Sequence, residues 1–325
     1  MDDRRTPVTT RTWEKLGILV APDPSVPWMQ SHAQLPVVVP APEKGNGGDR
    51  FEAFFASRDA GGRSHIGRAV LDLGDAPRVV SIDREPLLSP GPIGMFDADG
   101  VYPASIVMSG GERRLYYVGW LRGVPQPLFF TAIGLATARA GSHAFTRYSP
   151  APIVDRGPHD PCLVTSPSVY SDGRSWRMVY VSGLGWDERD GHLHSRYHLK
   201  SATSLDGVTW SRDGRVAVDF KDRDETNLGR ACVVRTRAGW QLWFCAASRT
   251  SKYRLAYAES ADGVAWQRCD ERAGLSVSSQ TSAFDSEMVA YPFVVRHGAT
   301  EFLFYNGNNF GRDGFAVARR PAVDD

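Results

Sequence analysis

The chain has 325 residues, of which 42% are hydrophobic and 11% aromatic, so it can bury a large core. Its 38 Lys and Arg residues nearly balance its 37 Asp and Glu residues. A formal net charge of +1 gives no electrostatic basis for binding nucleic acid or an anionic membrane, so we expect a neutral or mildly charged small molecule as the partner.

The sequence contains no recognisable export or metal-binding motif. The N-terminal residues lack the apolar core of a signal peptide, and no stretch approaches the roughly 18 apolar residues that cross a bilayer. The cysteines form no C-x-x-C pair and have no histidine at metal-ligand spacing, which predicts buried free thiols. We therefore predict a cytoplasmic protein with no metal and no other cofactor.

Five segments of the chain open in the same way, with polar or acidic residues, then a small residue or proline, then a β-branched run. They cover residues 31–39, 97–107, 160–170, 224–234 and 285–295. Aligned on Pro36, Pro103, Pro167, Ala231 and Pro292, successive segments are 67, 64, 64 and 61 residues apart. A period this regular indicates five copies of one structural unit.

Each opening is followed by further predicted strands. Alternating apolar and polar residues, rich in aromatics, predict second strands at 51–57, 114–120, 176–182, 241–247 and 301–305. Third strands are clearest at 197–202 and 253–258, and they run into Asp-Gly turns within 204–210 and 260–266. The tryptophan that ends such a motif then begins a fourth strand, as in 210–219.

Four strands in each of five units predict an all-β chain folded as a five-bladed β-propeller. The fifth unit ends after its third strand, near residue 319. The segment 13–20 has the pattern of a fourth strand, and we expect it to complete the last blade so that no sheet edge stays open. The whole chain, 1–325, is predicted to be one domain.

The central funnel of this propeller is the predicted site. The first strand of each blade lines the channel, so the residues just before each aligned position are brought together by the fold. Carboxylates at close range raise one another's pKa, and a pair of them is the equipment of glycoside hydrolysis. The candidate catalytic residues are Asp97, Asp160, Glu225, Asp285 and Glu287. An Asp before a strand also caps turns, whereas Glu is a poor turn former, so Glu225 and Glu287 are the sharper candidates.

Polar and aromatic residues near the same strand ends are candidates for binding the sugar. An Arg fork grips a carboxylate or a vicinal diol, and an aromatic face stacks on a sugar ring, as Trp120 and Trp186 are placed to do. The predicted substrate-binding residues are His32, Gln34, Arg230, Arg249, Tyr197, His198, Tyr305 and Asn306.

These blade openings, the S-x-D-G-x-x-W turns at 204–210 and 260–266 and the segment 302–309 resemble the five-bladed β-propeller glycosidase superfamily. That group includes arabinanases, xylosidases, fructosidases and related phosphorylases. More narrowly, the chain is similar to glycosidase-like propellers of bacterial polysaccharide and sugar-biosynthesis clusters. The resemblance covers nearly the whole chain and implies three carboxylates: Glu225, with Glu287 as second choice, for the acid, Asp160 for the orienting group, and Asp97 or Asp285 for the base.

Blade one departs from the superfamily pattern, because 31–34 reads Ser-His-Ala-Gln where the usual base stands. Either the base lies on another blade or hydrolysis is lost. The first hypothesis is therefore a glycoside-active enzyme. The alternatives are a transferase, isomerase or lyase acting on a sugar or nucleotide-sugar, and a carbohydrate-binding propeller without catalysis.

Overall fold

The computed structural model describes residues 12–42 and 49–322, and nearly all of its regular structure is β-strand, which confirms the all-β prediction. The described strands fall into five groups of four. The first group contains β2 (Ser31–Pro40), β3 (Arg50–Arg58), β4 (Ser64–Asp72) and β5 (Arg78–Ile82). The second contains β6 (Gly100–Ser109), β7 (Glu112–Arg122), β8 (Phe129–Arg139) and β9 (Thr146–Arg147).

The remaining groups repeat this order. The third contains β10 (Val164–Ser171), β11 (Trp176–Arg189), β12 (His192–Ser204) and β13 (Val216–Val218). The fourth contains β14 (Glu225–Arg235), β15 (Trp240–Ser248), β16 (Arg254–Ser260) and β17 (Gln267–Arg268). The fifth contains β18 (Ala290–His297), β19 (Thr300–Asn306), β20 (Phe315–Pro321) and, from the other end of the chain, β1 (Glu14–Val20).

Within each group, neighbouring strands pair antiparallel. A single parallel pair joins the first group to the second, and another joins the third to the fourth. In the fifth group β1 pairs antiparallel with β20, with Glu14 opposite Arg319 and Val20 opposite Phe315. The N-terminal strand is thus the outer strand of the group that also holds the last strand of the chain.

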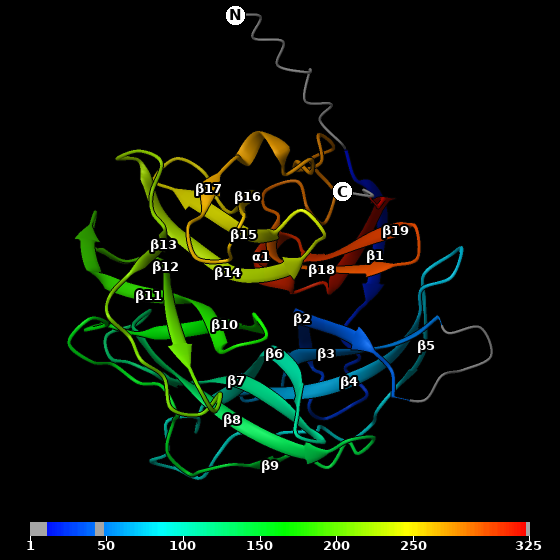
Figure 1. The fold of residues 1–325 in the computed structure, drawn as a ribbon, viewed down its shortest axis with the longest axis horizontal. Helices are drawn as coiled ribbons and strands as arrows, with labels where there is room; N and C mark the ends of the chain where they lie inside the picture. The colour runs from blue at the N-terminus through cyan, green and yellow to red at the C-terminus, as the bar shows by residue number, and fades with distance from the viewer. Residues whose placement is uncertain (1–11, 43–48, 323–325) are drawn as a thin grey trace, which may run out of the picture.

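The first strands of the five groups contact one another in sequence, β2 with β6, β6 with β10, β10 with β14 and β14 with β18. Strand β18 in turn contacts β2, so the series returns to its start. Viewed down the shortest axis of the molecule, these strands lie nearest the middle and the later strands of each group lie outside them (Figure 1). The residues of the first strands are therefore brought together around a common axis.

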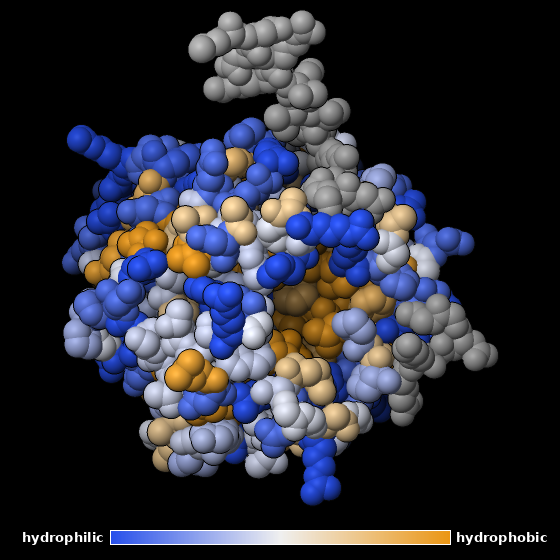
Figure 2. All heavy atoms as spheres, in the orientation of Figure 1, coloured by the Kyte–Doolittle hydropathy of each residue, from blue (hydrophilic) through white to orange (hydrophobic). Residues whose placement is uncertain are grey.

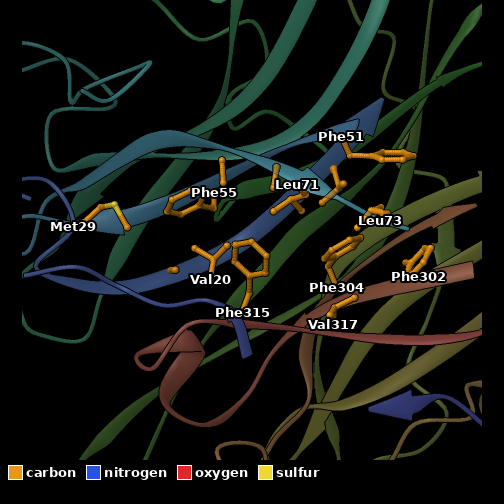
Figure 3. Close-up of a cluster of buried hydrophobic side chains, with 14 of the residues drawn as sticks. Val20, Met29, Phe51, Phe55, Leu71, Leu73, Phe302, Phe304, Phe315 and Val317 are labelled. Atoms are coloured by element: carbon orange, nitrogen blue, oxygen red, sulfur yellow. The ribbon is translucent and has the colours of Figure 1, made fainter. Parts of the chain in front are cut away.

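The hydrophobic core lies between neighbouring groups. Figure 3 shows one cluster in which Phe51 and Phe55 of β3 face Phe304 of β19 and Phe315 of β20, with Val20 of β1 among them. Similar clusters lie between the other groups. Apolar contact on both sides of each group fixes its position relative to its neighbours.

The strand pattern departs from the prediction in the third group. The expected second and third strands, 176–182 and 197–202, extend to Trp176–Arg189 and His192–Ser204. The added residues are mostly polar, and their sequence pattern is typical of a loop. In the structure they continue the pairing of the hairpin beyond a bulge at Gly183 and Gly185. A single helical turn, α1 (Asn308–Gly311), lies between β19 and β20.

Buried ion pairs hold the start of four groups. Asp97 accepts hydrogen bonds from Arg147 Nε at 2.8 Å and from the Tyr117 hydroxyl at 3.2 Å. Burial and then the Asp97 carboxylate raise the pKa of Tyr117. The basic residue that pairs with each carboxylate comes from the outer part of the same group. Each ion pair therefore links the start of the first strand to the fourth strand or to the segment leading into it.

The equivalent pairs use the same chemistry. Arg212 Nη1 lies 2.7 Å from Asp160 Oδ2, and Lys15 Nζ of β1 lies 2.7 Å from Asp285 Oδ2. The Tyr180 and Tyr305 hydroxyls donate to these two carboxylates. Arg268 binds Glu225 through two hydrogen bonds of 2.7 and 2.6 Å.

The first group replaces this ion pair with apolar packing. Met29 and Phe55 are fully buried there, and Ile82 of β5 packs against them in the same cluster. Ile82 stands opposite Ala69 of β4 as Arg147 stands opposite Ala136 of β8. The first group therefore lacks both the acid and the basic partner that the other four groups have at this place.

We expect Asp160→Asn to destabilise the fold. The carboxylate is 1% exposed and pairs with Arg212 and Lys200, so its removal leaves two cations without their anion. The free energy of unfolding should fall by about 2–4 kcal/mol, because removing one partner of a buried ion pair exposes the full desolvation cost of the other. Denaturant unfolding followed by tryptophan fluorescence measures this. Asp155→Asn, whose side chain is 53% exposed, is the matched control and should change stability little; equal effects of the two substitutions would contradict the assignment.

Candidate functional site

A cavity of about 1090 Å³ lies where the first strands converge. Its walls include Leu35 of β2, Tyr102 of β6, Ser166 of β10, Arg230 of β14 and Tyr291 of β18. The face of the molecule in Figure 2 is hollowed near its middle, with an apolar floor and hydrophilic residues around it. The cavity is at the large end of the range for small-molecule sites, which is about 300–1,000 Å³.

A backbone irregularity turns these side chains into the cavity. Each first strand has a register shift at its aligned position. In four of them the residue directly before that position has a positive φ: Leu35 (57°), Ser166 (49°), Arg230 (46°) and Tyr291 (56°). Residues other than glycine rarely adopt a positive φ. Such residues cluster at functional sites, and a β-bulge there can redirect a side chain.

Aromatic side chains form two walls of the cavity. Trp120 stacks on Tyr102 with ring centroids 6.0 Å apart, and its indole N–H donates to Ser64 Oγ at 2.8 Å. Trp186 meets the edge of Phe129 at 5.1 Å. Fixed aromatic faces of this kind suit the apolar face of a sugar ring.

A cluster of tyrosines lies on another side. The hydroxyls of Tyr197 and Tyr253 are hydrogen-bonded to each other, and Tyr253 and Tyr291 both pack near Phe310. Burial raises the pKa of Tyr197 to about 12 and that of Tyr253 and Tyr291 well above the usual value. At neutral pH these residues therefore carry hydroxyl protons that can be donated to a ligand.

The cavity lining is cationic. Among the described residues that line it there is no Asp and no Glu, whereas the following are basic: Arg58, Arg122, Arg189, Arg230 and Lys252. Two of these bases have a carboxylate nearby but outside the lining. Arg122 lies 3.7 Å from Asp99, and Lys252 pairs with Glu287.

Arg230 lies deepest, with an exposed fraction of 1%. It spans from β14 to two other first strands, donating from Nη1 to Pro103 O at 3.0 Å and from Nη2 to Pro36 O at 2.9 Å. Its Nε has no hydrogen-bond partner, and no carboxylate pairs with it in the described part of the chain. Burial lowers the pKa of Arg230 to about 10, so the guanidinium stays charged at neutral pH.

Arg58, at the end of β3, and Arg189 of β11 also form no ion pair with a carboxylate among residues 12–42 and 49–322, although Arg189 interacts electrostatically with Asp224. The buried Nε atoms of Arg58 and Arg189 are unpartnered too. Tyr291 interacts electrostatically with Arg58 and with Arg230. The cavity thus holds positive charge at Arg58 and Arg230 that no described carboxylate pairs with.

Three predicted binding residues line the cavity: Gln34, Arg230 and Tyr197. Glu287 is the one predicted catalytic residue joined to the lining, through its ion pair with Lys252. The other four predicted catalytic residues are not among the lining residues and form the buried ion pairs described above: Asp97, Asp160, Glu225 and Asp285. Their catalytic role stays a prediction.

The remaining predicted binding residues also lie outside the lining. Asn306 is fully buried and forms hydrogen bonds with the backbone of Leu35, Ala33 and Gly314. The Tyr305 hydroxyl donates a hydrogen bond to Asp285. His198 lies 3.1 Å from Asp219, and Arg249 donates to a backbone carbonyl.

His32 lies near the cavity base Arg58. Burial, followed by the charges of Arg58 and Arg312, lowers the pKa of His32 to about 4. The ring is therefore neutral at physiological pH and adds no charge of its own to this region.

Sequence reasoning missed Arg58, Tyr102, Ser166 and Tyr291. The last three share one signal, because each stands directly before its aligned proline. Arg58 gave no comparable signal, since it ends a second strand among ordinary polar residues.

No group of metal-ligating side chains, and no helix long and apolar enough to span a membrane, is found in residues 12–42 and 49–322. The four cysteines are free; Cys232 and Cys245 are buried, and Cys162 and Cys269 are partly exposed. The cytoplasmic location stays a prediction.

Comparison with solved structures supports the architecture. The chain superimposes on a glycoside hydrolase with a TM-score of 0.72 and 19% identity, over 97% of this chain and 94% of that one. A GH130-family protein from a study of hydrolases that target β-1,2-mannosidic linkages gives a TM-score of 0.68 and 16% identity, over 98% and 97%. The β-1,2-mannobiose phosphorylase of Listeria innocua gives 0.64 and 12%, over 90% of each chain. The fold is that of the glycosidase-like propellers.

No family model matches the sequence. Two curated proteins do, both from Mycobacterium tuberculosis. The uncharacterized protein MT1551 of strain CDC 1551 / Oshkosh is 40% identical over 94% of this chain and 98% of its own length. The uncharacterized protein Rv1502 of strain ATCC 25618 / H37Rv is 39% identical over the same shares. At this identity and coverage, the chain belongs to the family of these two mycobacterial proteins.

Proposed function

We propose that the chain is a glycoside-active enzyme that binds carbohydrate in the central cavity of a single five-bladed β-propeller, with β1 completing the last blade. The groups of four strands, the contacts that run from β2 around to β18 and back, and the pairing of β1 with β20 support the architecture. The observation that carries the function is the cavity itself, with aromatic walls and hydrogen-bonding side chains at the convergence of all five first strands.

The walls supply both kinds of contact that a sugar needs. Trp120 is held in place by Tyr102 and Ser64, so its indole face is fixed before a ligand arrives. Gln34, which is 2% exposed, and Asn227 offer amide groups along the lining. A rigid aromatic platform with a few placed polar groups is the usual composition of a small-molecule site.

Trp120→Ala should weaken carbohydrate binding at least tenfold, because it removes the largest fixed aromatic face of one wall. Titration of intrinsic fluorescence with a panel of mono- and disaccharides, charged sugars included, measures the dissociation constants. Tyr148→Ala removes an aromatic ring that is 58% exposed and lies outside the lining, and it serves as the control. Unchanged affinity in Trp120→Ala, or no binding of any sugar by the wild type, would count against the proposal.

The absence of carboxylates among the described lining residues favours a second candidate on the same scaffold, a non-hydrolytic transferase, isomerase or lyase acting on a sugar or nucleotide-sugar. Glycoside hydrolysis with two carboxylates requires them about 5–9.5 Å apart across the substrate. Of the predicted catalytic residues, four are engaged in buried ion pairs, and Glu287 alone adjoins the cavity through Lys252. Hydrolysis in its usual form would rest on Glu287 as the acid.

Glu287→Gln separates the two versions. If Glu287 is the general acid, kcat on glycosides with poor leaving groups, such as alkyl glycosides and disaccharides, should fall at least 100-fold, within the range for removal of a general acid. Glu271→Gln, an exposed glutamate of the 3-10 turn Asp270–Arg272, should leave kcat unchanged. Equal turnover by Glu287→Gln and the wild type would exclude Glu287 as the acid, whereas no turnover of any such glycoside by the wild type would favour the non-hydrolytic version.

A further inference from the structure

We propose that Arg58 and Arg230 form a subsite in the cavity for an oxyanion carried by the sugar, either a carboxylate or a phosphate ester. This inference rests on the proposed function, since it names the substrate class of the same cavity. It follows from which cavity bases pair with a carboxylate and which do not.

The bases at the rim are solvated and paired. The side chains of Arg122 and Lys252 are 42% and 57% exposed, and each has a carboxylate beside it, Asp99 and Glu287. These two pairs are close to neutral as units and are screened by water. They supply no fixed site for a charged ligand.

Arg230 and Arg58 differ from these two bases. Arg230 is 1% exposed, and its described hydrogen-bond partners are backbone carbonyls. Arg58 is half-buried, and its Nε has no hydrogen-bond partner among the described residues. A buried guanidinium without an anion is costly, and a bound carboxylate or phosphate would offset that cost while accepting charge-assisted hydrogen bonds.

The local geometry supports a small anion rather than a protein carboxylate. The Nε atoms of Arg58 and Arg230 are buried and lack partners, so donors remain free on both guanidinium groups. Tyr291 lines the same cavity, and because burial raises the pKa of its hydroxyl, this group keeps its proton and is a further donor. Ser166 also faces this region from the neighbouring first strand.

The backbone conformation points the same way. Arg230 and Tyr291 are both held at positive φ, and Asn306 holds the equivalent residue Leu35 through a 2.9 Å hydrogen bond to its backbone N–H. A fold that keeps bulky residues in this conformation at the same place in several strands has fixed the positions of their side chains before ligand binding.

The test compares matched neutral and charged ligands. Calorimetric titrations would use glucose, glucuronic acid and glucose 6-phosphate, the same three forms of galactose and mannose, and inorganic phosphate alone. We expect at least one charged sugar to bind at least tenfold more tightly than its neutral counterpart, with an affinity that falls as salt is raised. Arg58→Gln should abolish that preference, and Arg58→Lys should restore part of it.

Arg63→Gln is the matched control, because Arg63 lies on the same β3–β4 connection, pairs with Asp59 and does not line the cavity. It should retain the charge preference. Arg230→Lys keeps the positive charge but loses the guanidinium fork, so it should also lower the preference for charged sugars. Because Arg230 links three strands, the thermal unfolding of this variant is measured first. If Arg230→Lys does not fold, the result for Arg58→Gln decides the test.

The outcomes distinguish this subsite from the wider function. If sugars bind with no preference for charge, or if Arg58→Gln keeps the preference, the oxyanion subsite is wrong and the glycoside-active proposal stands. If phosphate alone binds in an Arg58-dependent manner and no sugar does, the subsite stands and the carbohydrate proposal fails. If nothing in the panel binds, both are wrong.

Discussion

The pairing of β1 with β20 is the contact on which the arrangement of the whole chain depends. It makes β1 the outer strand of the fifth group, so β20 has a partner strand on each side. An unpaired edge at β20 would favour association with other chains. Side chains reinforce it: Lys15 reaches Asp285, and Arg319 pairs with Glu14 at 2.7 Å. With the fifth group complete, β18 can rest against β2 as well as β14, and the first strands surround one axis.

A second anchor lies beside this pairing. The guanidinium of Arg320 lies over the rings of Trp13 and Trp243, 4.1 and 4.9 Å from their centroids, and its Nε donates to Glu301. The Trp13 indole N–H bonds the carbonyl of Ala273. The start of the chain is thereby tied to the fourth group as well as the fifth, and the cavity is enclosed by elements that cannot shift independently.

The molecule separates two uses of charge. Acid–base pairs at the starts of the groups are buried, complete and contribute to the fold, as Asp97 with Arg147 illustrates. The cavity, by contrast, keeps basic groups and excludes carboxylates among its described lining residues. A fold shared with glycoside hydrolases can therefore present a differently charged interior, because its side chains and not its strand order determine what binds.

Much of the fold could be predicted from the repeat period, since each aligned position begins a strand and the second strands alternate clearly. The site was harder because the register shifts reverse which face of the strand points inward. Asp97 and Asp160 were expected in the channel, yet they turn to bases on the outer strands, whereas Tyr291 and Ser166 face the cavity. Gln34 and Arg230 could be predicted as cavity residues because they lie at or beside the register shifts of their strands. The charge state of the cavity also depends on partners far apart in sequence, such as Lys15 for Asp285, which no local pattern reveals.

The joining of the first strand to the last also has a consequence for biogenesis. Strand β1 precedes every other described strand and its partner β20 follows them, so at typical elongation rates β1 waits roughly 15–60 s for its neighbour. During that interval Val20 lacks Phe315, which belongs to the same buried cluster in the finished protein. The intermediate groups can assemble during synthesis, but the fifth group is completed only once β20 has left the ribosome. Protection of the N-terminal strand in this period is thus a requirement of the architecture itself.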